Sequence, residues 1–323
     1  MATQFGVFVP QGWRMDLVEI ADPVEKYEAM TRVAKAADAI SAFDSIWVYD
    51  HFHTVPTPEL ETTFEAWSIT AALSRDTSRV NIGQMVTCNG YRNPALLAKI
   101  ASTIDVMSHG RLYCGLGAGW YEHEWRAYGY GFPETRDRMR MFREACEIVM
   151  KMWTEDYPTF EGEHYSIHGP INEPKGARKP HPSFWIGGSG EQVTLKLVAR
   201  FADACNMGPD PETLRRKFAI LRGHCDAIGR DFDTIIRSSN IPMFPLKPGE
   251  DPKVATERVR KSVGATYEDY LSTVWVGTPE QLVERIQLVI DTGVNYVIAY
   301  IPEVAYDHDR MHLFAEQIIP QLH

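Results

Sequence analysis

The chain has 323 residues, of which 44% are hydrophobic and 24% are charged, a composition typical of one large globular α/β domain or two smaller ones. Its formal net charge of −10 argues against nucleic-acid binding, because a phosphate backbone requires a basic surface. The sequence has no polybasic block, no apolar run near the ~18 residues of a membrane span, and no signal-peptide pattern at its start. The five cysteines are scattered and form no C-x-x-C pair, so they support neither a disulfide framework nor a zinc ribbon. We therefore expect a cytoplasmic protein that binds neither nucleic acid nor a membrane.

Eight short apolar runs are predicted to be β-strands, with helices between them. The strands are expected at residues 5–9, 45–49, 80–86, 111–116, 183–186, 202–206, 235–244 and 294–301. This alternation predicts a (β/α)8 TIM barrel rather than a doubly wound open sheet, which usually has fewer strands. We expect a single domain over residues 1–323. An insertion is predicted between the fourth and fifth strands, at about 153–182, where Pro, Gly, His and charged residues break the pattern.

The most informative turn follows the fourth strand, where Gly115-x-Gly117-x-Gly119 leads into Trp120 and Tyr121. Glycines let a backbone approach a flat or charged ligand closely, because they tolerate positive φ and have no Cβ. In a barrel, the carboxyl ends of all strands surround one pocket. This turn is therefore predicted to form part of a binding site with aromatic walls.

The loop after the third strand carries Thr87 and Asn89 as hydrogen-bonding groups behind the apolar Met85 and Val86. Apolar surface with a few polar groups suits a flat heterocycle with polar edges. We expect this loop to form a second wall of the same pocket.

The segment Gly187–Gly190 follows the fifth strand and precedes a helix. Backbone N–H groups and the positive end of a helix favour a phosphate there, and Ser189 adds a hydroxyl donor. A plain strand–helix turn is the alternative. The basic loop at 175–181 is expected to be solvated, with contact to an acidic ligand tail as the second interpretation.

Asp50 and His51 follow the second strand, and His53 comes two residues later. A histidine beside a carboxylate suits proton transfer near neutral pH. The H-x-H spacing also permits a metal site, but no further ligands follow the fifth and sixth strands. A structural Asp-His turn remains the third interpretation.

Four motifs together resemble the F-420-dependent oxidoreductase branch of the bacterial luciferase-like superfamily. They are SIWVYDHFH, VTCNGYRNPALLAKIASTIDVMSHGRL, GLGAGWYEHEWRAYG and FWIGGSGE, in this order along the chain. The long second motif is specific, whereas the region after about Cys205 is far less diagnostic. The resemblance implies a (β/α)8 barrel, usually a homodimer, that binds the deazaflavin coenzyme F-420 at the carboxyl ends of its strands.

The resemblance also implies roles for individual residues. Asp50 and His51 are expected near the reactive face of the deazaflavin. A non-proline cis peptide is expected at Gln84–Met85, where it forms a bulge behind the ring, and Gly187–Gly190 is expected to hold the coenzyme phosphate. The expected coenzyme-binding residues are Asp50, Gln84, Met85, Thr87, Asn89, Gly119, Trp120, Tyr121, Gly187, Gly188, Ser189 and Gly190.

One position departs from the resemblance. The sugar-phosphate dehydrogenases of this branch place a Glu directly after the glycine turn, where this chain has Trp120, and the nearest carboxylate is Glu122. A glucose-6-phosphate activity is therefore not expected.

The leading hypothesis is an oxidoreductase that transfers a hydride between F-420 and a small organic substrate, with His51 and Asp50 as catalytic residues. In this hypothesis Asp50 orients His51, which moves the proton. The insertion and the aromatic residues at 120–125 suggest an apolar or aromatic substrate. The alternatives are an FMN-dependent luciferase-like monooxygenase supplied with reduced flavin by a partner reductase, a metal-dependent hydrolase that uses His51 and His53, and a coenzyme-binding protein without turnover.

Overall fold

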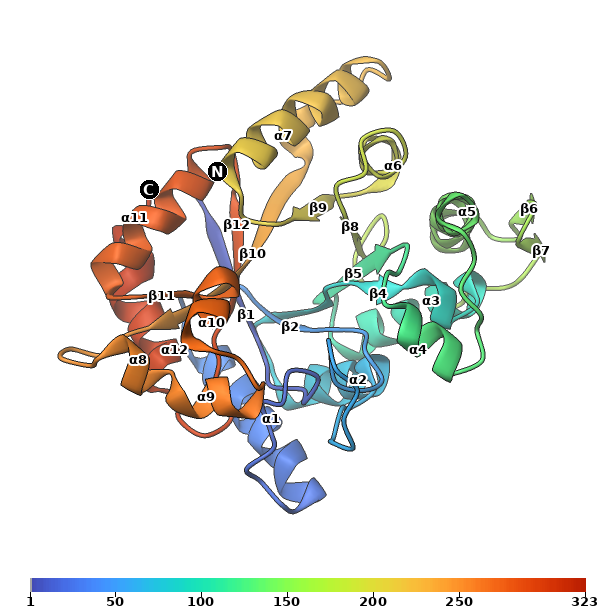
Figure 1. The fold of residues 1–323 in the computed structure, drawn as a ribbon. Coiled ribbons are helices and arrows are strands. Elements are labelled where there is room, and N and C mark those ends of the chain that lie inside the picture. Colours follow the sequence, from blue (N-terminus) through green and yellow to red (C-terminus); the bar gives the residue numbers. More distant parts are fainter. Residues whose placement is uncertain (1) are drawn as a thin grey trace.

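Eight parallel strands close into a barrel in the computed structural model, which describes residues 2–323 (Figure 1). They are β1 (Gln4–Phe8), β2 (Ser45–Val48), β3 (Asn81–Gln84), β5 (Leu112–Gly117), β8 (Ser183–Gly187), β9 (Ala204–Met207), β10 (Ile236–Pro245) and β12 (Tyr296–Tyr300). The barrel closes because β12 pairs with both β1 and β10, and β10 also pairs with β9. The predicted (β/α)8 barrel is confirmed.

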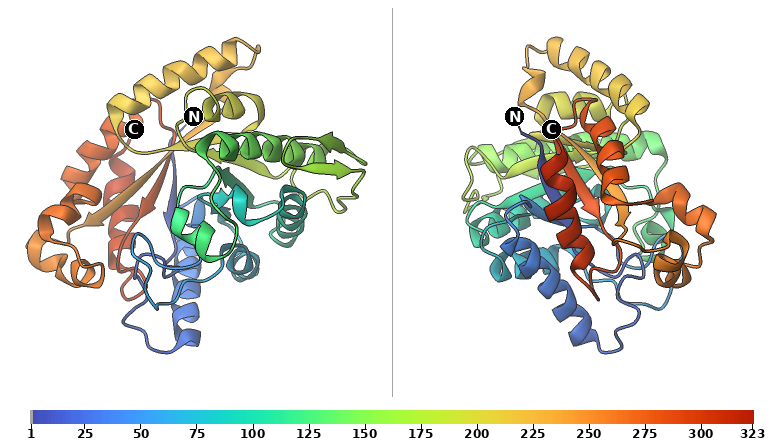
Figure 2. Two further views of the ribbon diagram at one scale, coloured as in Figure 1. Left: turned by 45° about the vertical axis from the view of Figure 1, so that its right-hand side comes forward. Right: turned by 90° about the vertical axis from the view of Figure 1, so that its left-hand side faces the viewer.

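Helices surround the barrel, as the views in Figures 1 and 2 show. The longer ones are α1 (Pro23–Ala39), α2 (Ala66–Asp76), α3 (Pro94–Met107), α5 (Thr135–Thr154), α6 (Thr194–Phe201), α7 (Pro211–Asp226) and α11 (Pro279–Ile290). Several start where the sequence offers a capping side chain followed by proline, as at Asp22, Asn93 and Thr278. Within residues 2–323, no helix is both long and apolar enough to cross a membrane.

Five shorter helices lie in the connections between the longer elements. They are α4 (Glu122–Ala127), α8 (Pro252–Ala255), α9 (Glu257–Ser262), α10 (Tyr267–Thr273) and α12 (Asp309–Leu313). Two short strands also extend the sheet. β4 (Thr87–Cys88) pairs with β5, and β11 (Trp275–Gly277) pairs with β10.

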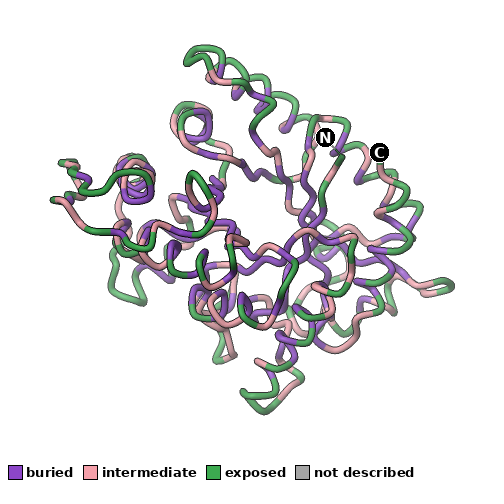
Figure 3. Tube along the Cα trace, turned by 180° about the vertical axis from the view of Figure 1, so that it is seen from behind, coloured by how far each residue is buried: buried purple, intermediate pink, exposed green. Residues whose placement is uncertain are grey.

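The core has two layers, because alternate residues of each strand point to opposite faces. The interior of the barrel is filled by the rings of Phe8, Trp47, Tyr113, Trp185 and Tyr296. Apolar residues on the other face of the strands pack against the helices, so the buried segments in Figure 3 follow the strands and the inner faces of the helices. The interior is therefore a packed core rather than a pore, and a ligand site must form beyond it at the strand ends.

Two segments interrupt the simple alternation of strands and helices. The predicted insertion at 153–182 contains an antiparallel hairpin of β6 (Thr159–Glu161) and β7 (Ser166–His168), which lies beside α5 on the outside of the barrel (Figure 1). The second segment runs from the end of β10 to the start of α11 and contains α8, α9 and α10. The second segment, and not the insertion, contributes to the site described below.

Candidate active site

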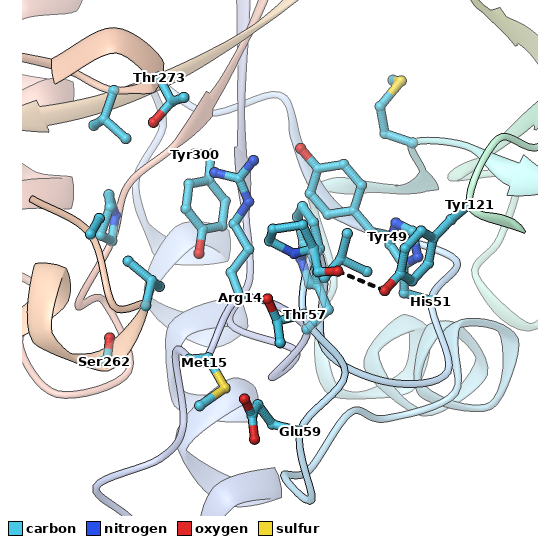
Figure 4. A pocket seen from close by; sticks show the side chains of 18 of the residues that line it. Arg14, Met15, Tyr49, His51, Thr57, Glu59, Tyr121, Ser262, Thr273 and Tyr300 are labelled. Carbon is cyan, nitrogen blue, oxygen red and sulfur yellow. Dashed lines mark hydrogen bonds between the residues drawn. The ribbon is translucent and has the colours of Figure 1, made fainter. Parts of the chain in front are cut away.

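A cavity of about 970 Å³ lies at the carboxyl ends of the strands (Figure 4). Its walls come from the loops after β1, β2, β3, β5 and β12 and from the segment around α9 and α10. In Figure 4, His51 and Tyr121 lie on one side, and Arg14 and Tyr300 lie together on the other. The ring of Trp13 lies between them, 5.1 Å from the His51 ring and 6.3 Å from the Tyr300 ring. We call these two parts of the cavity the His51 end and the Arg14 end.

The His51 ring is oriented by Glu124, a residue of α4. The distance from His51 Nδ1 to Glu124 Oε2 is 2.9 Å, and Glu124 is completely buried. The same carboxylate accepts hydrogen bonds from the Phe52 amide, at 2.7 Å, and from the Tyr91 hydroxyl, at 2.8 Å. Because an ionised carboxylate can only accept, Nδ1 carries the hydrogen. Nε2 of His51 is then the ring nitrogen that is free to exchange a proton.

The surroundings of Glu124 favour its ionised form. Burial alone would raise the pKa of Glu124, but the hydrogen bond and charge interaction with His51, together with the bonds from Tyr91 and Phe52, lower it below its ordinary value. The pKa of Tyr91 is raised, first by burial and then by the nearby Cys88 and Glu124. At neutral pH, Tyr91 is therefore a neutral donor and Glu124 a charged acceptor.

Asp50 does not orient His51, so this part of the sequence-based prediction is wrong. Its two carboxylate oxygens accept hydrogen bonds from both terminal nitrogens of Arg92, at 2.7 and 3.0 Å, and from the Cys88 amide, at 2.8 Å. Bidentate binding fixes the Asp50 carboxylate on Arg92, while the Nδ1 of His51 bonds to Glu124 instead. Asp50 lines the cavity, but its bonds tie the end of β2 to the loop after β4.

The predicted cis peptide lies one position further along the chain, between Met85 and Val86. The Gln84 side chain points away from the cavity, because its Nε2 donates to Thr70 Oγ1 of α2 at 2.8 Å. A coenzyme contact by the Gln84 side chain is therefore wrong. The alternation of β3 directs this side chain to the outer layer of the core.

The rest of this loop divides into lining and buried residues. Met85 and Thr87 line the cavity, and Thr87 Oγ1 accepts a hydrogen bond from the Trp67 indole at 3.1 Å. Asn89 is buried and is not part of the cavity wall. Its Nδ2 donates to the Tyr165 hydroxyl at 3.4 Å, whereas its Oδ1 has no partner among residues 2–323.

The turn after β5 reaches the cavity as predicted. Gly119 has a φ of +79°, and a Cβ there would lie 2.4 Å from Cys88 Sγ, so only glycine fits. Trp120 lines the cavity while 64% exposed, and the Tyr121 hydroxyl donates to the Pro56 carbonyl at 2.8 Å. Glu122 instead forms an exposed ion pair with Arg126 and does not line the cavity.

The glycine-rich segment Gly187–Gly190 lies against the cavity wall without lining the cavity itself. A Cβ on Gly187 would lie 2.8 Å from Cγ2 of Val86, which does line it. The Gly188 amide donates to the Asn206 carbonyl at 3.1 Å, and Ser189 is half-buried. The following helix, α6, begins at Thr194, so a short turn separates it from the glycines.

The basic loop at 175–181 lies at the opposite, amino end of the barrel, directly before β8. Its Arg178 donates to the Gly110 carbonyl at 2.9 Å, just before β5, and the Arg178 amide donates to Asp105 at 2.8 Å. The hypothesis that this loop contacts an acidic ligand tail at the site is therefore wrong.

The two histidines after β2 do not form a metal site. Nε2 of His53 lies 3.1 Å from Nδ1 of His123, whereas His51 pairs with Glu124. Within residues 2–323, no three His, Cys, Asp or Glu side chains form a group that could hold a metal ion. The hydrolase alternative thus lacks a ligand set in the described part of the chain.

Sequence reasoning missed Glu124, Arg14 and the segment around α9 and α10. Glu124 could have been considered as a partner of His51, because it follows the glycine turn by only five positions. Two other carboxylates were more obvious candidates, since Asp50 is adjacent to His51 and Glu122 is nearer to the turn. Arg14 lies in an irregular loop with no periodic pattern.

A cavity at the carboxyl ends of a (β/α)8 barrel, with a histidine paired to a buried carboxylate, defines the class of protein as a barrel enzyme. A family model described as luciferase-like monooxygenase matches residues 3–271, and the chain belongs to this family.

Relatives of two kinds are similar to this chain. An F420-dependent glucose-6-phosphate dehydrogenase of Amycolatopsis mediterranei (strain U-32) is 26% identical over 311 residues, which cover 86% of this chain and 90% of that protein. An FMNH(2)-dependent dimethylsulfone monooxygenase of Pseudomonas putida is 25% identical over 287 residues, or 79% of this chain and 78% of the relative. A solved structure of an F420-dependent secondary alcohol dehydrogenase, in complex with an F420-acetone adduct, matches with a TM-score of 0.80 at 22% identity and covers 100% of both chains.

Proposed function

We propose that this member of the family is an oxidoreductase that transfers a hydride between coenzyme F-420 and a small organic substrate. The observation that carries the proposal is the pairing of His51 with Glu124, which presents one histidine nitrogen to a cavity that Met85 and Val86 also line. The F420 dependence named for the dehydrogenase relative and for the structural neighbour supports the choice of coenzyme.

The residues around the bulge fit a flat ring with a phosphate-bearing side chain. A Cβ on Gly117 or Gly187 would lie 2.6 or 2.8 Å from the Val86 side chain, so glycine is needed for these segments to pack closely into one wall. Asn89 is not proposed as a ring contact, because its side chain is buried outside the cavity wall. We propose that Met85 and Thr87, which line the cavity, hold the ring and that Gly187–Gly190 holds the phosphate. When bound, F-420 supplies the hydride acceptor or donor.

His51 accepts or donates the proton that accompanies the hydride, depending on the direction of the reaction. In oxidation of an alcohol, Nε2 of His51 accepts the hydroxyl proton. The hydride leaves the carbon that bears the hydroxyl group and would pass to F-420. In reduction, the same nitrogen returns the proton to the carbonyl oxygen. Glu124 holds the ring through Nδ1, so that Nε2 is the nitrogen presented to the substrate.

The substrate is proposed to be apolar or aromatic. The cavity wall includes the rings of Trp13, Tyr49, Trp120 and Tyr300. Such rings bind apolar groups through large buried contact areas.

We further propose that the protein is a homodimer, as the family resemblance implies.

An FMN-dependent monooxygenase is the second candidate, because a relative of similar identity is FMNH(2)-dependent. Titrations with oxidised F-420 and with FMN, followed by ligand fluorescence, separate the two. Tighter binding of F-420, followed by F-420-dependent turnover with hydroxyl or carbonyl substrates, is the expected result. A preference for FMN would favour the monooxygenase, and binding of neither ligand would overturn both proposals.

A further inference from the structure

Arg14 lies at the end of the cavity opposite His51, and its guanidinium group forms no ion pair with the described residues. Its guanidinium carbon lies 4.7 Å from the ring centroid of Trp13 and 5.0 Å from that of Tyr300. Among residues 2–323, the Arg14 side chain makes no hydrogen bond and no ion pair, although the residue lines the cavity and is half-buried. Figure 4 shows this side chain running beside the Tyr300 ring, with its guanidinium directed away from Glu59.

A second polar group at the Arg14 end also lacks a partner. Tyr270, on α10, lines the cavity and is 4% exposed, and its buried hydroxyl has no hydrogen-bond partner among the described residues. A buried donor without an acceptor destabilises a protein. The Tyr270 hydroxyl is therefore an unsatisfied donor in the wall of the cavity that Arg14 also lines.

The other charged groups of the wall are satisfied or solvated. Lys261 is exposed and lies 2.7 Å from Glu257, and Asp269 accepts a hydrogen bond from the Thr266 hydroxyl at 2.7 Å. Glu59 is an exposed carboxylate. Asp16 is the nearby carboxylate on which the charge of Arg14 acts, but it accepts a hydrogen bond from the Gly12 amide at 2.7 Å and forms no ion pair with Arg14. Among the described residues, Arg14 is thus a cation of this wall that lies against aromatic rings and has no direct ion-pair partner.

A guanidinium has five N–H donors in a planar fork, and a carboxylate matches two of them at once. We propose that Arg14 binds a carboxylate group of the organic substrate, so that the enzyme acts on apolar or aromatic carboxylic acids. The acid group lies at the Arg14 end, while the reacting carbon lies near His51. This inference rests on the proposed function, because it assigns the second half of the same cavity.

A carboxylate could reach Arg14 from the substrate or from the acidic tail of F-420, and the experiment must distinguish these sources. The probes are 3-phenylpropanoate and 3-phenylpropan-1-ol, which share a ring and chain and differ in the charged group. Their binding is measured by calorimetry, both to the F-420 complex and to the protein without coenzyme. The variants are Arg14→Gln, Arg14→Lys and, as a matched control, Lys261→Gln, which removes an exposed cation from the same wall.

The wild type is expected to bind the carboxylate more tightly than the alcohol by about tenfold to a hundredfold, the range for a hydrogen bond to a charged group. Arg14→Gln should abolish this preference, Arg14→Lys should keep part of it, and Lys261→Gln should keep all of it. Equal melting temperatures would show that the variants are folded.

Absence of the preference in the wild type, or its persistence in Arg14→Gln, would overturn the inference. Weaker F-420 binding by Arg14→Gln with an unchanged probe preference would assign Arg14 to the coenzyme tail and overturn the substrate assignment. Failure of F-420 to bind the wild type would overturn the proposed function alone, because the titrations without coenzyme would still decide the role of Arg14.

Discussion

His51 and Glu124 are 73 positions apart in the chain, and their side chains meet at 2.9 Å in a part of the structure where the carboxylate is fully buried. The contact joins the end of β2 to α4, which follows β5. It fixes which nitrogen of His51 faces the cavity, and it places a carboxylate with a lowered pKa behind the ring.

The first prediction concerns the positioning role of Glu124. Glu124→Gln places an N–H group among four donors, from His51, Phe52, His53 and Tyr91, and removes the negative charge behind the His51 ring. We expect kcat to fall by about 10- to 100-fold, with little change in KM or in F-420 binding. Steady-state kinetics and coenzyme titration measure this. Glu122→Gln, on the same helix but exposed, is the control and should behave like the wild type. Equal losses in kcat and F-420 affinity would contradict a positioning role.

The second prediction concerns proton transfer by His51. His51→Ala should lower kcat by about 10²- to 10⁴-fold, the usual contribution of a general acid–base group. The dissociation constant for F-420 should change little. A single-turnover measurement separates the hydride step from product release. If coenzyme binding and turnover weaken together, His51 is a binding residue instead.

The third prediction concerns Asp50, which the structure ties to Arg92. Asp50→Asn breaks a largely buried ion pair, so we expect the free energy of unfolding to fall by about 3 kcal/mol. Thermal and denaturant unfolding measure the loss. Glu65→Gln, which changes the more exposed partner of Arg92, should cost less. Unchanged stability with lost turnover would return Asp50 to a role in proton transfer.

The fourth prediction concerns pH and Asp16. Burial raises the pKa of Asp16 to about 6, although the bond from the Gly12 amide and the charge of Arg14 oppose this. The folded protein therefore holds this proton more tightly than the unfolded chain, and its contribution to stability is lost as the pH rises from about 4 to about 6.

Asp16→Asn removes this titration while it keeps an acceptor for Gly12. The variant should gain on the wild type by up to about 2 kcal/mol between pH 4 and pH 7, as measured by denaturant unfolding at each pH. A constant difference between the two proteins across this range would contradict the assignment.

The barrel could be predicted because each strand is a compact apolar run and each long helix has its own periodic pattern. The placement of His51, Thr87, Gly119 and Trp120 at one cavity followed from that fold, since strand ends converge in a barrel. The partner of His51 could not be predicted, because it depends on how the six-residue helix α4 folds back over another strand. Gln84 was misplaced because a strand end does not by itself reveal which face its last side chain takes.

The cavity wall has two separate origins in the chain. The His51 end is built mainly from the first 125 residues, whereas much of the opposite wall comes from residues 259–274, in one continuous stretch between β10 and β11. That stretch lies outside the eight barrel strands, and its Tyr270 and Val274 pack against Phe244 and Leu246 at the end of β10. A change of substrate range can therefore begin with this one stretch and its packing partners, while the residues that hold His51 against Glu124 are left as they are.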